Sequence, residues 1–587
     1  MMKRTVTLTS LCLLALTANS LEASDAYLVR NLVSDIQDLA DYTDPNLQGA
    51  WGISESATSP FWIANAGSGT STLYGTSGAP VALVVAIPPS KGGGPAGSPT
   101  GTVYNGTSGF AIASGAATPF LFATFDGTIQ GWSPAVDRTH SKIMVDNSAS
   151  GAEYFGLAMA TADSGNTYLY AANFHSGAID IFDSNYKPVA MPGGFRDPDI
   201  PSGWAPFNIQ NIGGNLYVAF AKQNASHTFS VSGPGLGFVD VFAPNGVMIQ
   251  QLIVKGPLNA PWGLAKAPAG FGDYSGNLLV GNFGDGTINA FDPKTGDWIA
   301  ELKDPIGAPI TIPNLWALQA GNGASGGEAS AIYFTAGIPG PDNGNHGLFG
   351  RLHAAPQFAA SGVVNGANPQ GGIAPNTWIA IKGMNLAETT RNWNPGDFVN
   401  GDLPIDLDNV RVLVNDDPAY VYFVSPTQVN ILTSTDLATG PAQIQVNNNG
   451  LVSTISQVQV QALAPALFTT DGKHVMATHA DGTAVGTAAP ATPAKPGETI
   501  WLSGTGFGPT NPEIPDGKVI TTPLPLATTP TATVAGVLAQ VTAANLTSAG
   551  LYQIAVTIPA STANGDAQVI VQVGDQATPP VLIPVQR

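Results

Sequence analysis

The sequence predicts an all-β protein: a six-bladed β-propeller followed by two Ig-like β-sandwich modules. A unit of about 54 residues recurs six times within residues 26–355. A longer repeat of roughly 100 residues occupies the last third of the chain. Gly (69) and Pro (47) are abundant and only 10% of the 587 residues are charged, which favours many short strands joined by tight turns.

Each propeller unit contains an apolar strand, a short Asn/Asp/Gly turn and an alternating strand that ends in an aromatic residue. Four copies are clear and two are degenerate, and they occupy residues 61–75, 120–132, 167–182, 215–242, 277–291 and 331–352. The spacing between copies is 47 to 62 residues when counted from Asn65, Thr124, Asn173, Phe220, Asn282 and Thr335. This spacing fits the four-stranded blades of a propeller.

An aromatic residue precedes each unit and is expected to mark the innermost strand of a blade. The marker occurs at residues 50–54, 119–123, 154–158, 206–210, 261–265 and 315–319. In a propeller these strands surround the central channel, so Trp51, Trp262 and Trp316 are expected to lie in a ring there. These tryptophans either pack in the core or stack on a carbohydrate.

The beginning of the mature chain is expected to close the propeller. Blades four and five have outer strands at residues 248–256 and 298–305, but no such strand follows the sixth unit. Residues 26–35 precede the first aromatic marker, just as the outer strand of blade four precedes the fifth marker. We therefore expect them to form the outermost strand of blade six, because a ring of sheets otherwise leaves its terminal edges unpaired.

The amino-acid composition changes after Pro356, and the expected strands there are rich in Val, Thr, Ala and Pro. The two copies of the longer repeat align residues 374–387 with 495–508, 403–431 with 524–556, and 440–450 with 565–575. Their length and strand number are typical of Ig-like sandwiches. We expect the first module at residues 356–467. Residues 468–587 are expected to form the junction and then the second module, with a short strand around Val475–Thr478.

The first 23 residues read as a secretory signal peptide, with basic residues, an apolar run and small residues before the cleavage site. Cys12, the only cysteine, lies within it, so the mature chain would have neither disulfides nor a catalytic thiol. The net charge of −19 and the lack of basic clusters exclude nucleic acid as a natural partner. We expect a secreted or extracytoplasmic protein with no membrane span after cleavage.

Two parts of the sequence resemble known families. Residues 32–54 (LVSDIQDLADYTDPNLQGAWGIS), together with IANAGSGTSTLY, GNFGDGTINAFD and LFGR, resemble an uncharacterised family of secreted bacterial proteins, itself similar to six-bladed NHL-type propellers. This resemblance covers residues 27–355 and implies the fold but no catalytic residue. GTGFGPTNP at residues 504–512 resembles IPT/TIG domains, and the tandem pair resembles a C-terminal region common on secreted bacterial proteins.

The Asn/Asp/Gly turns are interpreted first as hairpin turns, because these residues tolerate positive φ and bond their own backbone. The turns between second and third strands share a propeller face with the crossings between blades. Polar side chains could therefore converge at one channel mouth: Asn65, Asp126, Asn173, His175, Asn282 and Asp285. Ca²⁺ takes six to eight such oxygen ligands, and Asn65, Asn173, Asn282 and Asp285 are the candidates to hold it.

Three functional hypotheses follow, of which the third is a purely structural extracellular role. The first is an exported binding or cell-surface protein, with the propeller loop face as a platform for a polysaccharide or surface protein and the Ig-like tail as a spacer or adhesive arm. It rests on the signal peptide, the absence of a catalytic motif and the modular tail. The second is a Ca²⁺-dependent hydrolase or lyase with its site at the channel mouth, similar to gluconolactonase-like propellers. The lack of an obvious Glu at the start of the channel-lining strands argues against this second hypothesis.

Overall fold

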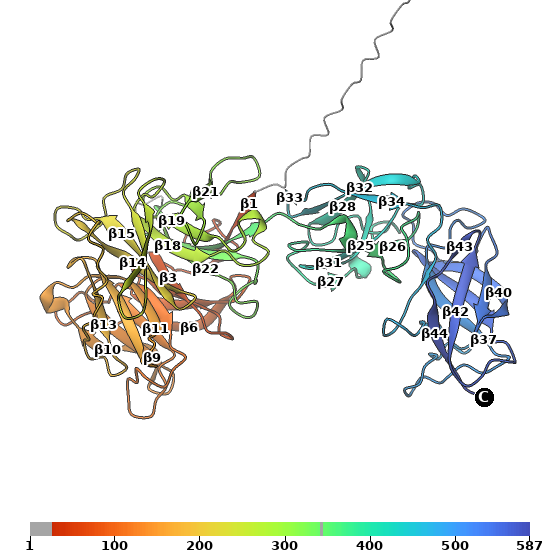
Figure 1. Cartoon of the computed structure of the whole chain (residues 1–587), viewed down its shortest axis with the longest axis horizontal. Coiled ribbons are helices and arrows are strands. Elements are labelled where there is room, and N and C mark those ends of the chain that lie inside the picture. The colour runs from red at the N-terminus through yellow and green to blue at the C-terminus, as the bar shows by residue number, and fades with distance from the viewer. Residues whose placement is uncertain (1–25, 341–343) are drawn as a thin grey trace, which may run out of the picture.

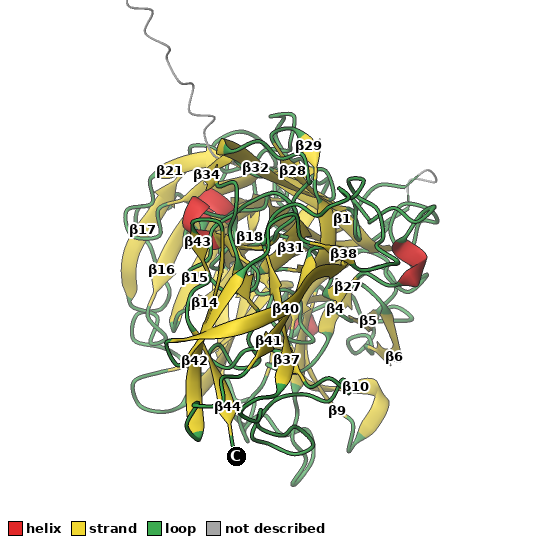
Figure 2. Ribbon diagram, turned by 90° about the vertical axis from the view of Figure 1, so that its right-hand side faces the viewer, coloured by secondary structure: helices red, strands yellow, loops and turns green. Residues whose placement is uncertain are grey.

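The computed structural model describes residues 26–340 and 344–587. The propeller lies at one end, the first Ig-like module in the middle and the second at the far end (Figure 1). Strands dominate (Figure 2), and the described helices are short 3₁₀ turns: η1 (Ser148–Ser150), η2 (Gly272–Tyr274), η3 (Ala360–Gly362) and η4 (Pro395–Asp397). None of the described helices has the length and apolar character needed to cross a bilayer. The expected signal peptide, with Cys12, falls outside the described residues.

Six blades of antiparallel strands form the propeller, and the strands of the first two blades are joined into one eight-stranded sheet. The first three blades contain β3 (Ala50–Ser54), β4 (Phe61–Asn65), β5 (Thr70–Tyr74) and β6 (Pro80–Ala86); β7 (Pro99–Tyr104), β8 (Phe120–Thr124), β9 (Thr128–Ser133) and β10 (Asp137–Asp146); and β11 (Tyr154–Thr161), β12 (Thr167–Asn173) and β13 (Ala178–Phe182). The fourth and fifth contain β14 (Trp204–Ile212), β15 (Asn215–Lys222), β16 (Phe238–Phe242) and β17 (Met248–Val254); and β18 (Pro261–Lys266), β19 (Leu278–Asn282), β20 (Ile288–Phe291) and β21 (Trp298–Glu301).

The sixth blade joins the two ends of the propeller, as the sequence predicts. Its strands are β22 (Leu315–Ala320), β23 (Ile332–Ala336), β24 (Leu348–Ala354) and β1 (Tyr27–Ser34). β1 pairs antiparallel with β24, from Tyr27 opposite Ala354 to Ser34 opposite Leu348. The two-residue strand β2 (Tyr42–Thr43) pairs in parallel with β1, so β1 is the fourth strand of the blade but not the edge of its sheet. The propeller is therefore closed by strand pairing.

Blade two corrects one expectation. The segment at residues 119–123, expected to lie innermost, belongs to the second strand β8, and the innermost strand is β7. Thr100 and Gly101 replace the aromatic marker there. The Thr100 hydroxyl donates to the Tyr154 carbonyl at 2.5 Å, and a Cβ at Gly101 would lie 2.5 Å from the Leu157 nitrogen. Close approach of blades two and three therefore requires small residues at this position.

Polar side chains tie neighbouring blades together around the channel. Besides Thr100, Asn208 of blade four donates its amide to the Trp262 carbonyl of blade five at 2.7 Å. Thr335 of blade six donates to the Trp51 carbonyl of blade one. All three side chains are buried, so these bonds are made away from water. They join strands that belong to different blades and do not pair with each other.

Both Ig-like modules are sandwiches. The first contains one sheet of β25 (Val363–Asn365), β26 (Trp378–Lys382), β31 (Gln428–Leu432), β30 (Tyr420–Ser425) and β27 (Arg391–Asn392), and another of β29 (Asp417–Pro418), β28 (Val410–Val414), β32 (Gly440–Asn448), β33 (Leu451–Val452) and β34 (Ser456–Val460). The second contains β35 (Ala466–Leu467), β36 (Ala477–Thr478), β37 (Thr499–Thr505), β38 (Leu524–Pro525), β39 (Thr531–Val534), β40 (Val537–Ser548), β41 (Leu551–Thr557), β42 (Gly565–Val573), β43 (Gln576–Ala577) and β44 (Val581–Val585).

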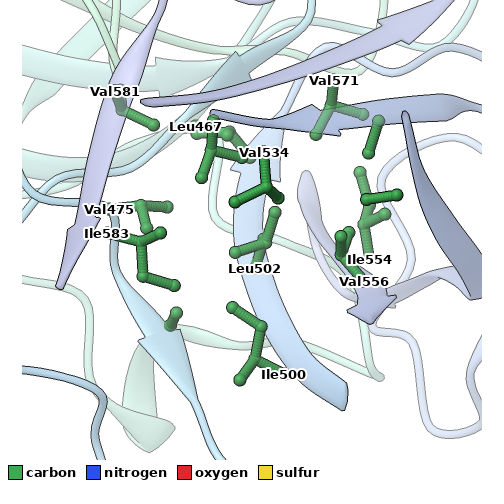
Figure 3. Packing of buried hydrophobic residues seen from close by; sticks show 14 of the residues in the cluster. Leu467, Val475, Ile500, Leu502, Val534, Ile554, Val556, Val571, Val581 and Ile583 are labelled. Carbon is green, nitrogen blue, oxygen red and sulfur yellow. The ribbon is translucent and has the colours of Figure 1, made fainter. Parts of the chain in front are cut away.

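The internal repeat of the tail matches the order of these strands. β26 and β37, from the first aligned pair of segments, each lie inside a sheet, and so do β32 and β42 from the last pair. The expected short strand near residue 477 is β36, which pairs with β37. Inward-facing Ile500, Leu502, Val534 and their neighbours fill the core of the second module (Figure 3).

Candidate functional site

Five aromatic side chains from five innermost strands fill the centre of the propeller. They are Trp51, Phe155, Phe207, Trp262 and Trp316, on β3, β11, β14, β18 and β22. Trp51 stacks on Trp316 with ring centroids 3.8 Å apart, and Trp262 meets the same ring edge-on at 5.9 Å. The three tryptophans are only 4–6% exposed. They lie around the channel as the marker predicts, but they are covered, so a ligand would first meet the residues above them.

A second aromatic layer covers this ring on the face where the chain crosses between blades. Phe125 and Phe283 each follow the last residue of a second strand, and Phe229 comes from the long β15–β16 connection. Phe283 stacks on Trp316 at 4.2 Å, Phe229 lies 5.8 Å from Phe283, and Phe125 lies 5.4 Å from Phe155. All three of these side chains are only partly buried. We call Phe125, Phe229 and Phe283 the aromatic floor.

Little space remains inside the channel. A cavity between the innermost strands, lined by Gly52, Asn208, Gln210 and Gln319 among others, has a volume of about 10 Å³. That is roughly the room that a single water molecule needs. This cavity therefore has no room for an organic substrate.

Two predicted site residues of blade five are brought together by a third. The Asn282 oxygen accepts from the Asn259 backbone N–H at 3.0 Å, and the Asn259 amide donates to Asp285 at 2.9 Å. Asp285 also accepts from the backbone and the hydroxyl of Thr287. The stretch is a hairpin turn whose polar atoms are used within blade five and the loop before it, as the turn interpretation predicts.

Asn65 and Asn173 are likewise held within their own turns. The Asn65 amide donates to Thr70 and Thr72, although its buried oxygen has no partner. The Asn173 oxygen accepts from the backbone of Glu153 and Ser176, and its amide donates to Asp180. Asp126 accepts from the Ser90 backbone at 2.6 Å. Hydrogen bonds link none of these three side chains to the Asn282–Asp285 pair.

His175 lies next to two groups that the sequence did not single out. Its ring centroid is 6.2 Å from that of His227, and its Nδ1 is buried without a partner. The backbone carbonyl of Glu153 accepts from Phe174, the residue before His175. Burial raises the pKa of Glu153 to about 7, and one of its oxygens has no partner. These groups add polar side chains at the turn that follows β12.

No group of three or more His, Cys, Asp or Glu side chains with metal-binding geometry occurs in residues 26–340 and 344–587. The predicted calcium ligands also include the side-chain oxygens of asparagine residues. The Asn173 and Asn282 oxygens already accept hydrogen bonds from backbone N–H groups, which lowers their capacity to bind a cation. Calcium binding stays a prediction.

Two buried carboxyl groups were not predicted from the sequence. Glu55 follows the end of β3, and burial raises its pKa to about 8, partly offset by a hydrogen bond with Gln319. Asp240 on β16 is fully buried, and burial together with the nearby Asp197 raises its pKa to about 8. Asp240 lies among the apolar residues of its strand, FVDVF. This single acidic residue in an apolar strand could have predicted a buried carboxyl group from the sequence.

The fold and its centre define the class of protein: a six-bladed β-propeller with a filled channel, joined to an IPT/TIG domain. The IPT/TIG domain model matches residues 363–461. The chain belongs to the same family as two uncharacterised proteins of Acanthamoeba polyphaga mimivirus. Protein R648 is 32% identical over 56% of this chain and 81% of its own length, and protein L690 is 33% identical over 55% and 85%. These viral relatives do not support the expected bacterial origin.

Solved structures with a similar fold are distant. A streptogramin B lyase is 13% identical over 56% of this chain and 97% of its own, with a TM-score of 0.30. A luciferin-regenerating enzyme is 14% identical over 56% and 96%, with a TM-score of 0.34. Identities and scores this low carry no inference about activity. The propeller and the IPT/TIG domain fit a binding or adhesive protein.

Proposed function

We propose that the protein is an exported binding protein whose propeller recognises a surface polymer, a polysaccharide or a protein, at the aromatic floor. The Ig-like modules then serve as a spacer or adhesive arm. The observation that carries this proposal is the filled channel: the face of the propeller is accessible, and its centre is not.

The chemistry of the face supports recognition of a large ligand. Phe125, Phe229 and Phe283 present partly exposed rings, while His227 and Asp285 beside them are exposed and polar. An apolar centre with a polar rim is the usual anatomy of a binding surface. Aromatic side chains also supply large contact area at a low cost in side-chain entropy.

The tail supports the role of an arm. Figure 1 shows both Ig-like modules on one side of the propeller, so most of the propeller surface is left uncovered by the modules. Asn385 of the first module donates to the Gly270 carbonyl of the propeller at 2.7 Å, and both partners are held in place by this buried contact. The modules can therefore extend the propeller from an attachment point without covering its face.

Arrays of polysaccharides and of extracellular proteins test the proposal on the mature full-length chain. We expect a ligand to bind and Phe229→Ser to weaken that binding. Because Phe229 comes from a loop, its loss should leave the strands intact. Trp298→Ser is the matched control, since Trp298 is 55% exposed on the outer strand of blade five. Turnover in a lactone and ester screen without any array ligand would overturn the proposal.

A further inference from the structure

A second candidate binding site lies between the two Ig-like modules, far along the chain from the propeller. A pocket of about 380 Å³ opens between one sheet of the first module and the β40–β41 hairpin of the second. Its lining includes Trp378, Trp393, Tyr422, Asn430, Met476 and Ser548. The volume is at the lower end of the range for small-molecule sites, which occur preferentially at domain interfaces.

Three aromatic rings form one corner of this pocket. The Trp378 and Trp393 centroids lie 5.6 Å apart, and Tyr422 lies 5.3 Å and 5.0 Å from them. All three pairs meet at steep angles, between 60° and 80°, so the rings face different directions. Tyr422 sits at a bulge in β30, between Val421 and Phe423, and the Trp393 backbone donates to its carbonyl. Bulges commonly redirect a side chain near a binding site.

The pocket is held in shape by contacts between the modules. The indole nitrogen of Trp378 donates to the Ala549 carbonyl at 2.9 Å, and its backbone nitrogen donates to the Thr505 hydroxyl. Gly550 has φ of +57°, and a Cβ there would lie 2.8 Å from the Trp378 indole nitrogen. On the neighbouring side, Asp516 accepts hydrogen bonds from Tyr420 and Thr435 of the first module. A preformed pocket avoids part of the ordering cost of binding.

The lining is neutral but not wholly apolar. None of its residues carries a charge, although the whole chain has a net charge of −19. The indole N–H of Trp393, the hydroxyls of Tyr422 and Ser548 and the Asn430 amide group donate no hydrogen bond to other described residues. A lipid tail would leave these groups without partners, at about 1–3 kcal/mol for each group that becomes buried. An ionic ligand would find no opposite charge.

We infer that this pocket binds a neutral carbohydrate through one or two pyranose rings. A pyranose has flat C–H faces that stack on indole and phenol rings, and hydroxyl edges that exchange hydrogen bonds with amide and hydroxyl groups. The corner of Trp378, Trp393 and Tyr422 offers the first kind of contact. Asn430 and Ser548 offer the second. This site is independent of the propeller face, so either proposal can fail without the other.

Titration of neutral oligosaccharides tests the inference on the mature full-length chain. The probes are gluco-, manno-, xylo- and N-acetylchito-oligosaccharides, measured by calorimetry and by saturation-transfer NMR. We expect at least one probe to bind with Kd between about 10 µM and 1 mM, and binding to be insensitive to salt. Trp393→Ala should weaken it at least about tenfold, whereas Trp393→Phe should retain most of it.

Two further variants keep the test decisive if Trp393→Ala unfolds the module. Ser548→Arg places a bulky side chain at the exposed rim and should also abolish binding without a loss of thermal stability. Trp298→Ala on the propeller is the control and should bind as the wild type does. The inference is overturned if no probe binds up to about 10 mM, or if Trp393→Ala and Ser548→Arg both leave the affinity unchanged.

Discussion

Arg351 of the propeller contacts Glu388 of the first Ig-like module, with guanidinium nitrogen and carboxylate oxygen 2.7 Å apart. Arg30, on the strand that closes the propeller, contacts the same carboxylate, and His353 lies 3.5 Å from it. Burial alone would raise the pKa of Glu388, but Arg351, His353 and Arg30 together hold it below its usual range. One acidic side chain thus joins both closing strands of blade six to the arm.

Glu388→Gln should loosen the joint between propeller and arm. It leaves the Arg351 guanidinium, which is 5% exposed, with Glu328 as its remaining acidic partner. Removing one member of a buried ion pair costs about 3 kcal/mol. We expect a lower free energy of unfolding and a broader distribution of sizes in small-angle scattering. Asp406→Asn is the control, because the Arg411–Asp406 pair is exposed and worth under about 1 kcal/mol. Equal effects of both variants would contradict the role of Glu388 in joining the propeller to the arm.

Tyr27→Ala should open the propeller at its closing strand. Tyr27 is fully buried, its hydroxyl donates to the Phe271 carbonyl at 2.9 Å, and its ring lies 4.6 Å from that of Phe271. Loss of such a ring costs about 3–5 kcal/mol in chemical denaturation. Tyr42→Ala removes a ring that is 38% exposed and should change stability by under about 0.5 kcal/mol. A Tyr27→Ala protein as stable as the Tyr42→Ala protein would show that closure contributes little.

Asp240→Asn should stabilise the propeller in alkaline but not in acidic solution. The pKa of Asp240 rises from 3.8 to about 8 on folding, because of burial and then Asp197. Between these values the folded state binds more protons than the unfolded state, so wild-type stability falls as pH rises from about 4 to about 8. Asparagine avoids this ionisation.

The expected gain from Asp240→Asn is on the order of 2 kcal/mol at pH 8 and near zero at about pH 4, since water entry and relaxation reduce the full cost of a buried charge. Chemical denaturation across this pH range measures it. Asp285→Asn, at an exposed position, is measured in parallel as the comparison. A constant difference between wild type and Asp240→Asn at all pH values would exclude this account of Asp240.

Calcium should have little effect on stability if the Asn/Asp turns act only as turns. A tight site in the native state alone would add about 2.7 kcal/mol at a hundredfold excess over Kd. Melting in excess Ca²⁺ and in chelator distinguishes the two cases. A shift of that size, lost in Asp285→Asn, would support the calcium site at Asn65, Asn173, Asn282 and Asp285 and favour the enzymatic hypothesis.

Repetition explains which parts of the fold the sequence could predict. Asn65, Asn173 and Asn282 recur at the same place in their blades because each second strand must turn back there. Six such turns reveal six blades even when two are degenerate. Blade two was misassigned because Thr100 and Gly101, which meet the neighbouring blade closely, stand where other blades have an aromatic residue.

The candidate sites were harder to predict because they depend on contacts between units. Trp51 and Trp316 are far apart in sequence, and their 3.8 Å stacking is produced by ring closure. Phe125 and Phe283 follow the turn marker directly, so that position was a usable signal for the aromatic floor. The pocket at Trp393 depends on the angle between the two Ig-like modules, which no local pattern encodes.

Calorimetric titration of the array-selected ligand into wild type and Phe229→Ser tests the central claim most directly. If the propeller recognises its ligand at the aromatic floor, Phe229→Ser binds at least about tenfold more weakly while its melting temperature stays close to that of the wild type. Equal affinities of the two proteins would place the binding site elsewhere and contradict the account.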